Sequence, residues 1–165
     1  MSLKIELGFQ KPIAMLAHEA LLNTYYTASC LRKKAGHFLH QFGLTDVQFN
    51  LMMLLQHQSN PDDGGLSQAQ LSSMMLVNRP NITALVDRME KSCLVERTSM
   101  PMDRRYNIIK LTERGKKLLL KIEPLYAQEV DRIMDVLMES EQKRLISMLE
   151  KIRSNITNGN QNEDN

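Results

Sequence analysis

Residues 66–111 have the sequence LSQAQLSSMMLVNRPNITALVDRMEKSCLVERTSMPMDRRYNIIKL, and this stretch decides the fold. Ser67 and Gln70 have the spacing of a capping box, in which the serine oxygen and the glutamine side chain satisfy backbone donors reciprocally at the start of a helix. A short helix is therefore expected to begin at Ser67. Its expected buried residues are Leu71, Met74 and Met75.

A second helix is expected to begin at Asn78, because asparagine is a favoured N-cap residue and Pro80 follows in the first turn, where a missing N–H costs nothing. The apolar residues that recur at i, i+3, i+4 and i+7, and should form one buried stripe, are Ile82, Leu85, Val86 and Met89. The opposite face is short and flat at its N-terminal end, and its Arg and Asn side chains can form paired hydrogen bonds with base edges in a major groove. An ordinary amphipathic surface helix has the same pattern.

Two strands should follow, at 95–98 and 106–111, because both segments are rich in β-branched, aromatic and aliphatic residues. The loop between them carries Asp103, Arg104 and Arg105. Guanidinium groups on such a loop suit a minor groove, whose negative potential attracts them, and Asp103 can orient one arginine while the other reaches the DNA. A solvated charged turn is the alternative. Together the helices and the hairpin predict a winged helix-turn-helix.

Four motifs in this part of the chain, L-S-Q-x-x-L, N-R-P-N-I-T-x-L-V-D-R-M-E, L-V-E-R and D-R-R-x-x-x-I-x-L-T-x-x-G, resemble the multiple antibiotic resistance regulator (MarR) family of bacterial transcription factors. The resemblance covers residues 44–115 densely and in order, and the flanking helices carry weaker motifs. It implies a mainly α fold with a small β-hairpin, in which a winged helix-turn-helix is joined to long N- and C-terminal dimerisation helices. It also implies a double-stranded DNA-binding regulator, by family habit a repressor released by a small, often aromatic, ligand.

The resemblance further implies which residues contact DNA. The contacts from the second helix would come from Arg79, Pro80, Asn81 and Thr83, with Arg88 near the DNA backbone. In the hairpin, Asp103 and Arg105 form the D-x-R motif, with Arg105 as the minor-groove contact and Arg104 as a phosphate contact. The N-terminus of the second helix would offer free N–H groups to a phosphate. A two-fold dimer would set both recognition helices in successive major grooves, roughly 34–36 Å apart, on a palindromic operator.

The composition fits one cytoplasmic domain. The 165 residues, 42% of them hydrophobic, suffice for a sizeable core. No segment is long and apolar enough to cross a membrane, and the N-terminus lacks the apolar region of a signal peptide, so a cytoplasmic protein is expected. The net charge is only +2, but residues 66–117 carry ten Lys/Arg against five Asp/Glu, which concentrates positive charge where phosphates would lie.

Long helices are expected on both sides of this region. Apolar residues at three-or-four spacing run through residues 12–42, with Pro12 in the first turn and Gly43 just past the end. Such a helix would span roughly 46 Å, longer than one domain needs for its own core, so a second subunit is the expected partner. Capping residues predict further helices that begin at Thr45, Thr112 and Ser140.

The expected organisation is one intertwined domain. Its parts are an N-terminal dimerisation helix (1–43), the winged helix-turn-helix lobe (44–115), C-terminal dimerisation helices (116–156) and a disordered tail (157–165). The usual input of the family is a ligand bound between the dimerisation helices and the DNA-binding lobe. Apolar candidates for that pocket are Tyr25, Leu31, Met52 and Met53, although helical Met and Tyr more often form plain core.

Two alternatives remain. The family commonly has glycine where this chain has Cys93, a position expected to adopt a left-handed backbone, and Cys93 and Cys30 would be the residues of a thiol-based redox-sensing regulator. Lone cysteines without redox-motif spacing are more often small buried hydrophobes. The second alternative is a winged-helix protein-interaction module without a DNA target. The affinity of such a module for its partner would not depend on the salt concentration, whereas the affinity for DNA falls steeply as the salt concentration rises.

No enzymatic, metal or cofactor chemistry is expected. No nucleophile, base and orienting residue occur in a recognisable motif spacing, and there is no glycine loop that would hold a phosphate. His37 and His40 have i, i+3 spacing, but no cysteine or carboxylate at ligand spacing completes a site. The expected partners are therefore an operator, a second copy of the chain and a small-molecule effector, with no membrane.

Overall fold

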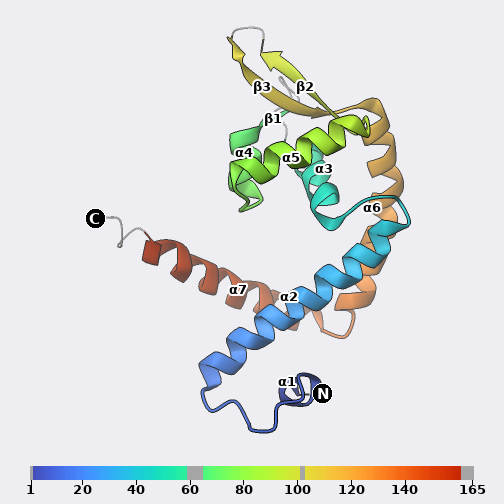
Figure 1. Ribbon diagram of the computed structural model, residues 1–165. Coiled ribbons are helices and arrows are strands. Elements are labelled where there is room, and N and C mark those ends of the chain that lie inside the picture. Colours follow the sequence, from blue (N-terminus) through green and yellow to red (C-terminus); the bar gives the residue numbers. More distant parts are fainter. Residues whose placement is uncertain (1, 59–64, 101–102, 161–165) are drawn as a thin grey trace. The chain divides into compact units, whose positions relative to one another are not determined.

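The computed structural model (Figure 1) describes the backbone of residues 2–58, 65–100 and 103–160, and the side chains of all of these except residues 99, 100, 103–107, 159 and 160. In chain order the elements are α1 (Leu3–Glu6), α2 (Leu16–His40), α3 (Asp46–Gln58), β1 (Leu66–Ser67), α4 (Gln68–Met74), α5 (Arg79–Lys91), β2 (Val95–Met100), β3 (Asp103–Leu111), α6 (Glu113–Met134) and α7 (Glu139–Asn160). The chain forms two compact units, Met1–Lys121 and Ile122–Asn165, which are described separately.

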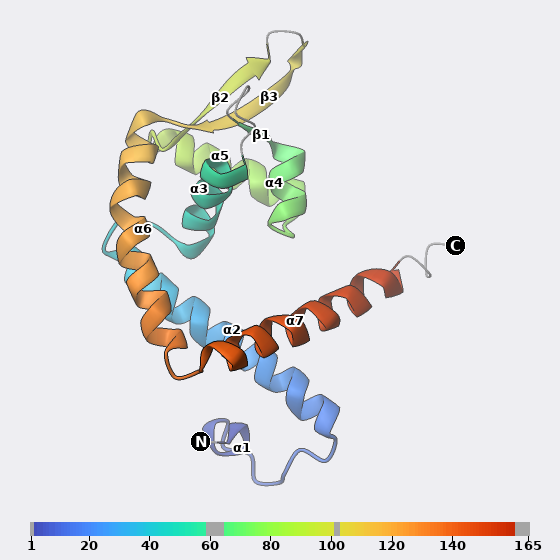
Figure 2. The same ribbon diagram turned by 180° about the vertical axis from the view of Figure 1, so that it is seen from behind.

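The first unit contains a three-stranded antiparallel sheet in the order β1-β3-β2 (Figure 2). In its register Leu66 pairs with Ile109 and Val95 pairs with Leu111. Strand β1 was not predicted, because it has two residues and exists only through its pairing with β3. The predicted fold class, mainly α with a small β-hairpin in a winged helix-turn-helix, is confirmed.

The core of the first unit lies where α3, α4 and α5 pack against the sheet. The stripe predicted for α5 is confirmed, since its four members have exposed fractions of 0–4%: Ile82, Leu85, Val86 and Met89. Helix α3 contributes Phe49, Leu51, Met52 and Leu55 to the same core. In α4 the prediction is wrong for Met74, which is exposed, and for Met75, which is half-buried and follows the last helical residue. The helix has only seven residues, so its C-terminal end lies outside the core.

Three of the predicted helix starts are capped by hydrogen bonds between side chains and backbone groups. In the capping box of α4, Ser67 Oγ accepts the Gln70 N–H at 3.2 Å, and the Ser67 N–H donates to Gln70 Oε1 at 2.8 Å. The reciprocal pair also occurs at the start of α3, between Thr45 and Gln48. At the start of α6, Thr112 Oγ1 accepts the N–H of the third residue that follows it. These three starts are therefore confirmed as capped.

Four helices of the first unit end in the same backbone motif. After α5 the Cys93 N–H donates to the Glu90 carbonyl at 2.9 Å and the Leu94 N–H donates to the Met89 carbonyl at 2.9 Å, which is a Schellman motif with Cys93 at C′. Cys93 accordingly has φ 56°, so the predicted left-handed backbone is confirmed. The same pair of bonds follows α1 at Gly8 (φ 67°), α2 at Gly43 (φ 71°) and α4 at Leu76 (φ 51°).

Helix α2 differs from its prediction. It begins at Leu16, with Met15 as N-cap, and ends at His40, so it is shorter than residues 12–42 and Pro12 lies before it. Gly43 does follow its end, as predicted. Leu39 is its buried residue, whereas Leu16, Tyr25 and other apolar side chains along it are exposed. A short helix that was not predicted, α1, precedes it.

The second unit contains the C-terminal part of α6 and all of α7. Helix α7 begins at Glu139, and the Met138 N–H donates to Glu141 Oε2 at 2.8 Å, so the predicted cap at Ser140 is wrong. It extends to Asn160, so the expected disordered tail is wrong for residues 157–160, and residues 161–165 lie outside the described part. The exposed large apolar residues of α7 are Ile146, Met148, Ile152 and Ile156. Within the described residues no helix meets the length and hydropathy that a membrane crossing requires.

Candidate nucleic-acid interface

The start of α5 is the best-defined part of the candidate interface. Asn78 is its N-cap, and Asn78 Oδ1 accepts the Asn81 N–H at 3.2 Å, with Pro80 in the first turn. The predicted free N–H groups at this end are mostly absent, because Pro80 has none and Asn78 occupies that of Asn81. The amide of Arg79, the first residue of the helix, is a donor that this helix start offers to a phosphate.

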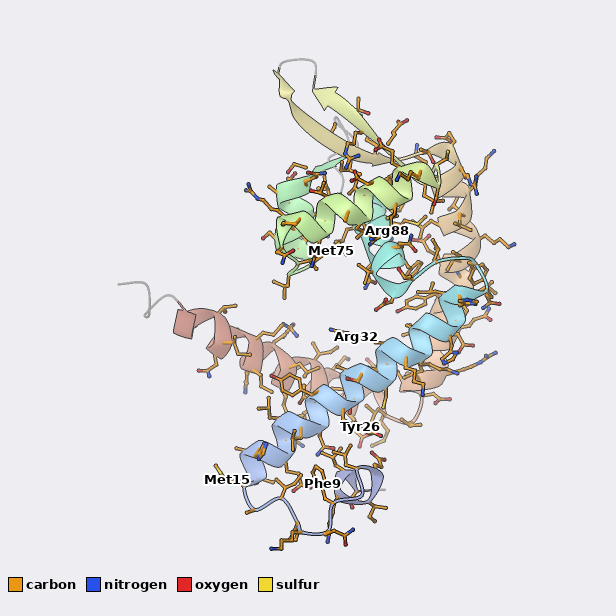
Figure 3. All side chains as sticks on the ribbon, viewed as in Figure 1. Phe9, Met15, Tyr26, Arg32, Met75 and Arg88 are labelled. Carbon is orange, nitrogen blue, oxygen red and sulfur yellow. The ribbon has the colours of Figure 1, made fainter. Side chains whose placement is uncertain are left out.

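The outer face of α5 is exposed wherever DNA contacts were predicted: at Arg79, Pro80, Asn81, Thr83 and Arg88. Figure 3 shows Arg88 on this helix. Thr83 Oγ1 donates its hydroxyl hydrogen to the Arg79 carbonyl of the same helix at 3.1 Å. The outward side of the threonine therefore presents an oxygen lone pair and a methyl group. Such a face can accept a hydrogen bond from a base or contact a thymine methyl group.

The hairpin of β2 and β3 is longer than predicted. The strands extend to Met100 and from Asp103, so Asp103, Arg104 and Arg105 belong to the first residues of β3 and not to a loop of seven residues. The prediction of a long arginine-bearing loop is therefore wrong, because β3 begins at Asp103 and cross-strand pairing reaches the Met100–Asp103 pair after a register shift between Ser99 and Met100. The side chains of these three residues lie outside the described part of the structure.

An ion-pair cluster that the sequence analysis missed joins this hairpin to α5. Arg97 on β2 places Nη2 2.5 Å from Asp87 Oδ1, its Nη1 contacts Glu90 Oε2, and its backbone N–H donates to Glu90 Oε1 at 3.1 Å. Partial burial lowers the pKa of Arg97, but the hydrogen bond to Asp87 and the charges of Glu90 and Asp87 outweigh it and raise the pKa above its ordinary value. The guanidinium is therefore charged under all ordinary conditions. Asp87 and Glu90 lie three positions apart on one side of α5, a spacing that could have signalled the cluster.

A cavity of about 730 Å³ lies within the first unit, between α3 and the turn that joins α4 to α5. Figure 3 labels Arg32 on α2 and Met75 at the end of α4, which both line it. Its remaining lining residues are Asp46, Val47, Asn50, Met53, Leu54, His57, Gln58, Met74, Leu76 and Val77. Seven of its twelve lining residues are apolar and five are polar or charged, a mixture that suits a small organic molecule with a polar group.

The pocket residues predicted from the sequence are only partly brought together. Met53 lines the cavity, whereas Met52 is fully buried in the core. Tyr25 and Leu31 are exposed on α2 and do not line it. The four residues therefore do not form one pocket within the described chain.

The cysteine and histidine candidates form no cluster. Cys30 and Cys93 are free and exposed, so the expectation of buried cysteines is wrong. Thr112 Oγ1 donates to the Cys93 carbonyl at 2.7 Å. This hydrogen bond joins the end of α5 to the start of α6 through the backbone of Cys93. Among the described residues, no three His, Cys, Asp or Glu side chains are close enough to hold a metal ion.

Comparisons with known proteins place this arrangement in a family. A family model described as MarR family matches residues 42–105. The chain is 32% identical over 117 residues to the HTH-type transcriptional regulator MhqR of Bacillus subtilis. The matched residues cover 71% of this chain and 77% of MhqR.

Solved structures show the same fold. Sco3205, a MarR family transcriptional regulator from Streptomyces coelicolor crystallised in complex with DNA, matches with a TM-score of 0.76 and 24% identity over 88% of this chain and 92% of its own. CouR from Rhodococcus jostii RHA1, bound to p-coumaroyl-CoA, matches with a TM-score of 0.73 and 21% identity over 85% of this chain and 95% of its own. With the match to MhqR, these findings show that the chain belongs to the MarR family of transcriptional regulators.

Proposed function

We propose that this protein binds a palindromic double-stranded DNA operator as a homodimer, represses transcription there, and leaves the DNA when a small, often aromatic, ligand binds. The exposed N-terminal half of α5 is the observation that carries the proposal, because it presents Arg79, Asn81 and Thr83 on a helix whose other side is fully buried. Its relatives are transcriptional regulators, not enzymes.

The two parts of the interface have different tasks. Arg79 and Asn81 suit paired hydrogen bonds with base edges in the major groove, and Thr83 and Pro80 suit apolar contact with bases. Arg88, about two turns beyond Asn81 on the exposed face, suits a phosphate. In the hairpin, Arg105 is assigned to the minor groove and Arg104 to a phosphate, with Asp103 to orient them. The relative Sco3205 was crystallised in complex with DNA, which supports DNA binding by a chain of this fold.

The exposed apolar faces support a dimer. Leu16, Leu21 and Tyr25 on α2 and Ile146 and Ile152 on α7 are all more than 40% exposed. Exposed apolar side chains that gather on one helix mark an interaction site, and each of the two helices carries several. Residues 1–43 and 116–156 are therefore assigned to dimerisation and residues 44–115 to DNA binding. A two-fold axis between the copies would place both α5 helices on one face of the duplex.

The cavity beside the α4–α5 turn is assigned to the effector. Its volume of about 730 Å³ suits a small organic molecule, and the apolar lining from Met53, Leu54 and Met75 suits an aromatic or aliphatic body. Arg32 and His57 on the lining suit a polar or anionic group of the same molecule. The relative CouR was crystallised bound to p-coumaroyl-CoA, which supports a ligand with an aromatic group.

Selection of bound sequences from a random DNA pool tests the DNA-binding proposal. We expect one palindrome with half-sites about one helical turn apart. The affinity for that sequence should fall by roughly 10³-fold or more between about 50 and 200 mM salt if six or more phosphates are contacted. No enriched sequence, or an affinity that is insensitive to salt, would favour a protein-interaction module.

A further inference from the structure

We propose that Arg97 is a positioning residue for DNA binding: it fixes the β2–β3 hairpin against the recognition helix α5, without touching DNA itself. The inference rests on the proposed function, because it explains how two parts of one interface keep the spacing that one duplex requires. Arg97 belongs to neither set of predicted DNA contacts.

The geometry of Arg97 is that of a bridge. Its two terminal nitrogens bind carboxylates on successive turns of α5, at Asp87 and Glu90, and its own backbone N–H donates to the second oxygen of Glu90. The planar fork of a guanidinium suits two acceptors at once, which gives direction as well as attraction. Three contacts therefore join one point of β2 to one side of α5.

The position of Arg97 in the strand makes this bridge the anchor at the base of the hairpin. Val95 faces the core and is 1% exposed, and Arg97 is the next residue on the same face of β2. Its cross-strand partner, Ile109, is fully buried. The hairpin continues away from α5 beyond this point, toward its tip (Figure 1). A change of angle at Arg97 is therefore magnified at the distal end of β3, where Arg105 begins the strand with Asp103 and Arg104.

The bridge also neutralises a carboxylate that would otherwise repel DNA. Asp87 is exposed on α5, four residues after Thr83, so its carboxylate lies beside the face assigned to DNA. An uncompensated carboxylate there would repel phosphates. Arg97 neutralises this charge from the protein side, which leaves the cations on the outer face, including Arg88, to attract DNA.

The bridge stabilises the fold itself only weakly. The side chains of Arg97, Asp87 and Glu90 are 24%, 49% and 39% exposed, and ion pairs that water reaches contribute little to the free energy of unfolding. Variants at Arg97 should therefore fold, with a change in Tm below about 3 °C. A loss of DNA affinity in them would reflect the arrangement of the interface.

The test compares Arg97→Gln and Arg97→Lys, with Lys143→Gln as the control. Lys143 on α7 pairs with Glu139 at 2.5 Å, so the control also removes one cation and one exposed ion pair. We expect Arg97→Gln to weaken operator binding about tenfold and the control to change it less than twofold. Arg97→Lys keeps the charge but lacks the planar fork, so it should bind within about threefold of Arg97→Gln. Wild-type affinity in Arg97→Lys or in Arg97→Gln would overturn the proposal.

A second measurement needs no DNA. In the free protein, ¹⁵N relaxation of the hairpin amides should show lower order parameters in Arg97→Gln than in the wild type, while the amides of α5 stay unchanged. Unchanged order in the hairpin would overturn the anchoring role. If no DNA sequence is bound by the wild type, the proposed function fails, and this relaxation measurement still decides whether Arg97 anchors the hairpin.

Discussion

Replacing Cys93 by glycine is expected to stabilise the protein, although it removes a side chain. Cys93 is the C′ residue of the Schellman motif after α5 and has φ 56°. An L-residue in this left-handed region costs roughly 1–2 kcal/mol, and glycine avoids that cost. Glycine also has more freedom in the unfolded chain, which offsets roughly 0.5–1 kcal/mol of the gain. The Cys93 side chain is exposed, so its removal sacrifices little packing, and we expect a net gain of about 0.5–1 kcal/mol.

Urea denaturation of Cys93→Gly and Cys93→Ala measures this gain. The alanine variant also removes the thiol but retains Cβ, so it should match the wild type, whereas the glycine variant should unfold at a higher urea concentration with an unchanged m-value. In thermal unfolding the gain corresponds to an increase in Tm of about 1–4 °C for a chain of this length. All variants are compared at one protein concentration, because the stability of a dimer depends on it. If Cys93→Gly is no more stable than Cys93→Ala, the backbone at this position is not strained and the reasoning fails.

Three further predictions address packing, DNA binding and assembly. Gly115→Ala should destabilise the protein by about 1–3 kcal/mol in urea denaturation, because the new Cβ would lie 2.2 Å from the Leu94 carbonyl oxygen; Gly36→Ala, with no such neighbour within 4 Å, is the control and should be neutral or stabilising. Arg105→Ala should weaken operator binding at least tenfold at fixed salt with an unchanged Tm, and an unchanged gel-shift titration would refute its role in the minor groove. Ile152→Glu, on the exposed face of α7, should shift the molecular mass in light scattering toward one chain, whereas an undisturbed dimer would exclude this face from the interface.

The features that the sequence predicted are those set by residues close together in the chain. The buried stripe of α5 follows from a spacing of three and four residues, and the capping boxes at Ser67 and Thr45 each involve residues three positions apart. The left-handed backbone at Cys93 was predicted because the family that the sequence resembles commonly has glycine at this position, between the recognition helix and Leu94. Such features depend on local geometry, so they could be inferred before any tertiary structure was known.

The features that the sequence did not predict depend on contacts between distant segments. Strand β1 exists because Leu66 and Ser67 pair with β3, about forty residues later. The length of the hairpin depends on pairing that continues to Met100 and Asp103, which propensity alone cannot bound. The start of α2 was placed too early because Pro12 is compatible with a helix start but does not determine one.

The candidate site divides in the same way. The exposed face of α5 was predicted because the buried stripe fixes its opposite side. The bridge of Arg97 was missed because it joins a strand to a helix, seven and ten residues earlier in the chain. The cavity was predicted only at Met53, since much of its wall comes from the turn after α4, whose position relative to α3 is a property of the folded lobe.

That turn explains how a ligand in the cavity could change DNA binding. Met75, Leu76 and Val77 line the cavity and immediately precede Asn78, the N-cap of the recognition helix. The turn is held to α4 by the Val77 N–H bond to the Ser72 carbonyl and by the Ser72 hydroxyl, which donates to the Val77 carbonyl at 2.5 Å. A ligand that binds more tightly when this turn is displaced shifts the population toward a conformer whose α5 helix is misplaced in the groove. A difference of about 1–3 kcal/mol between the two conformers would lower operator affinity roughly 5- to 150-fold, and by linkage the operator would weaken ligand binding by the same factor.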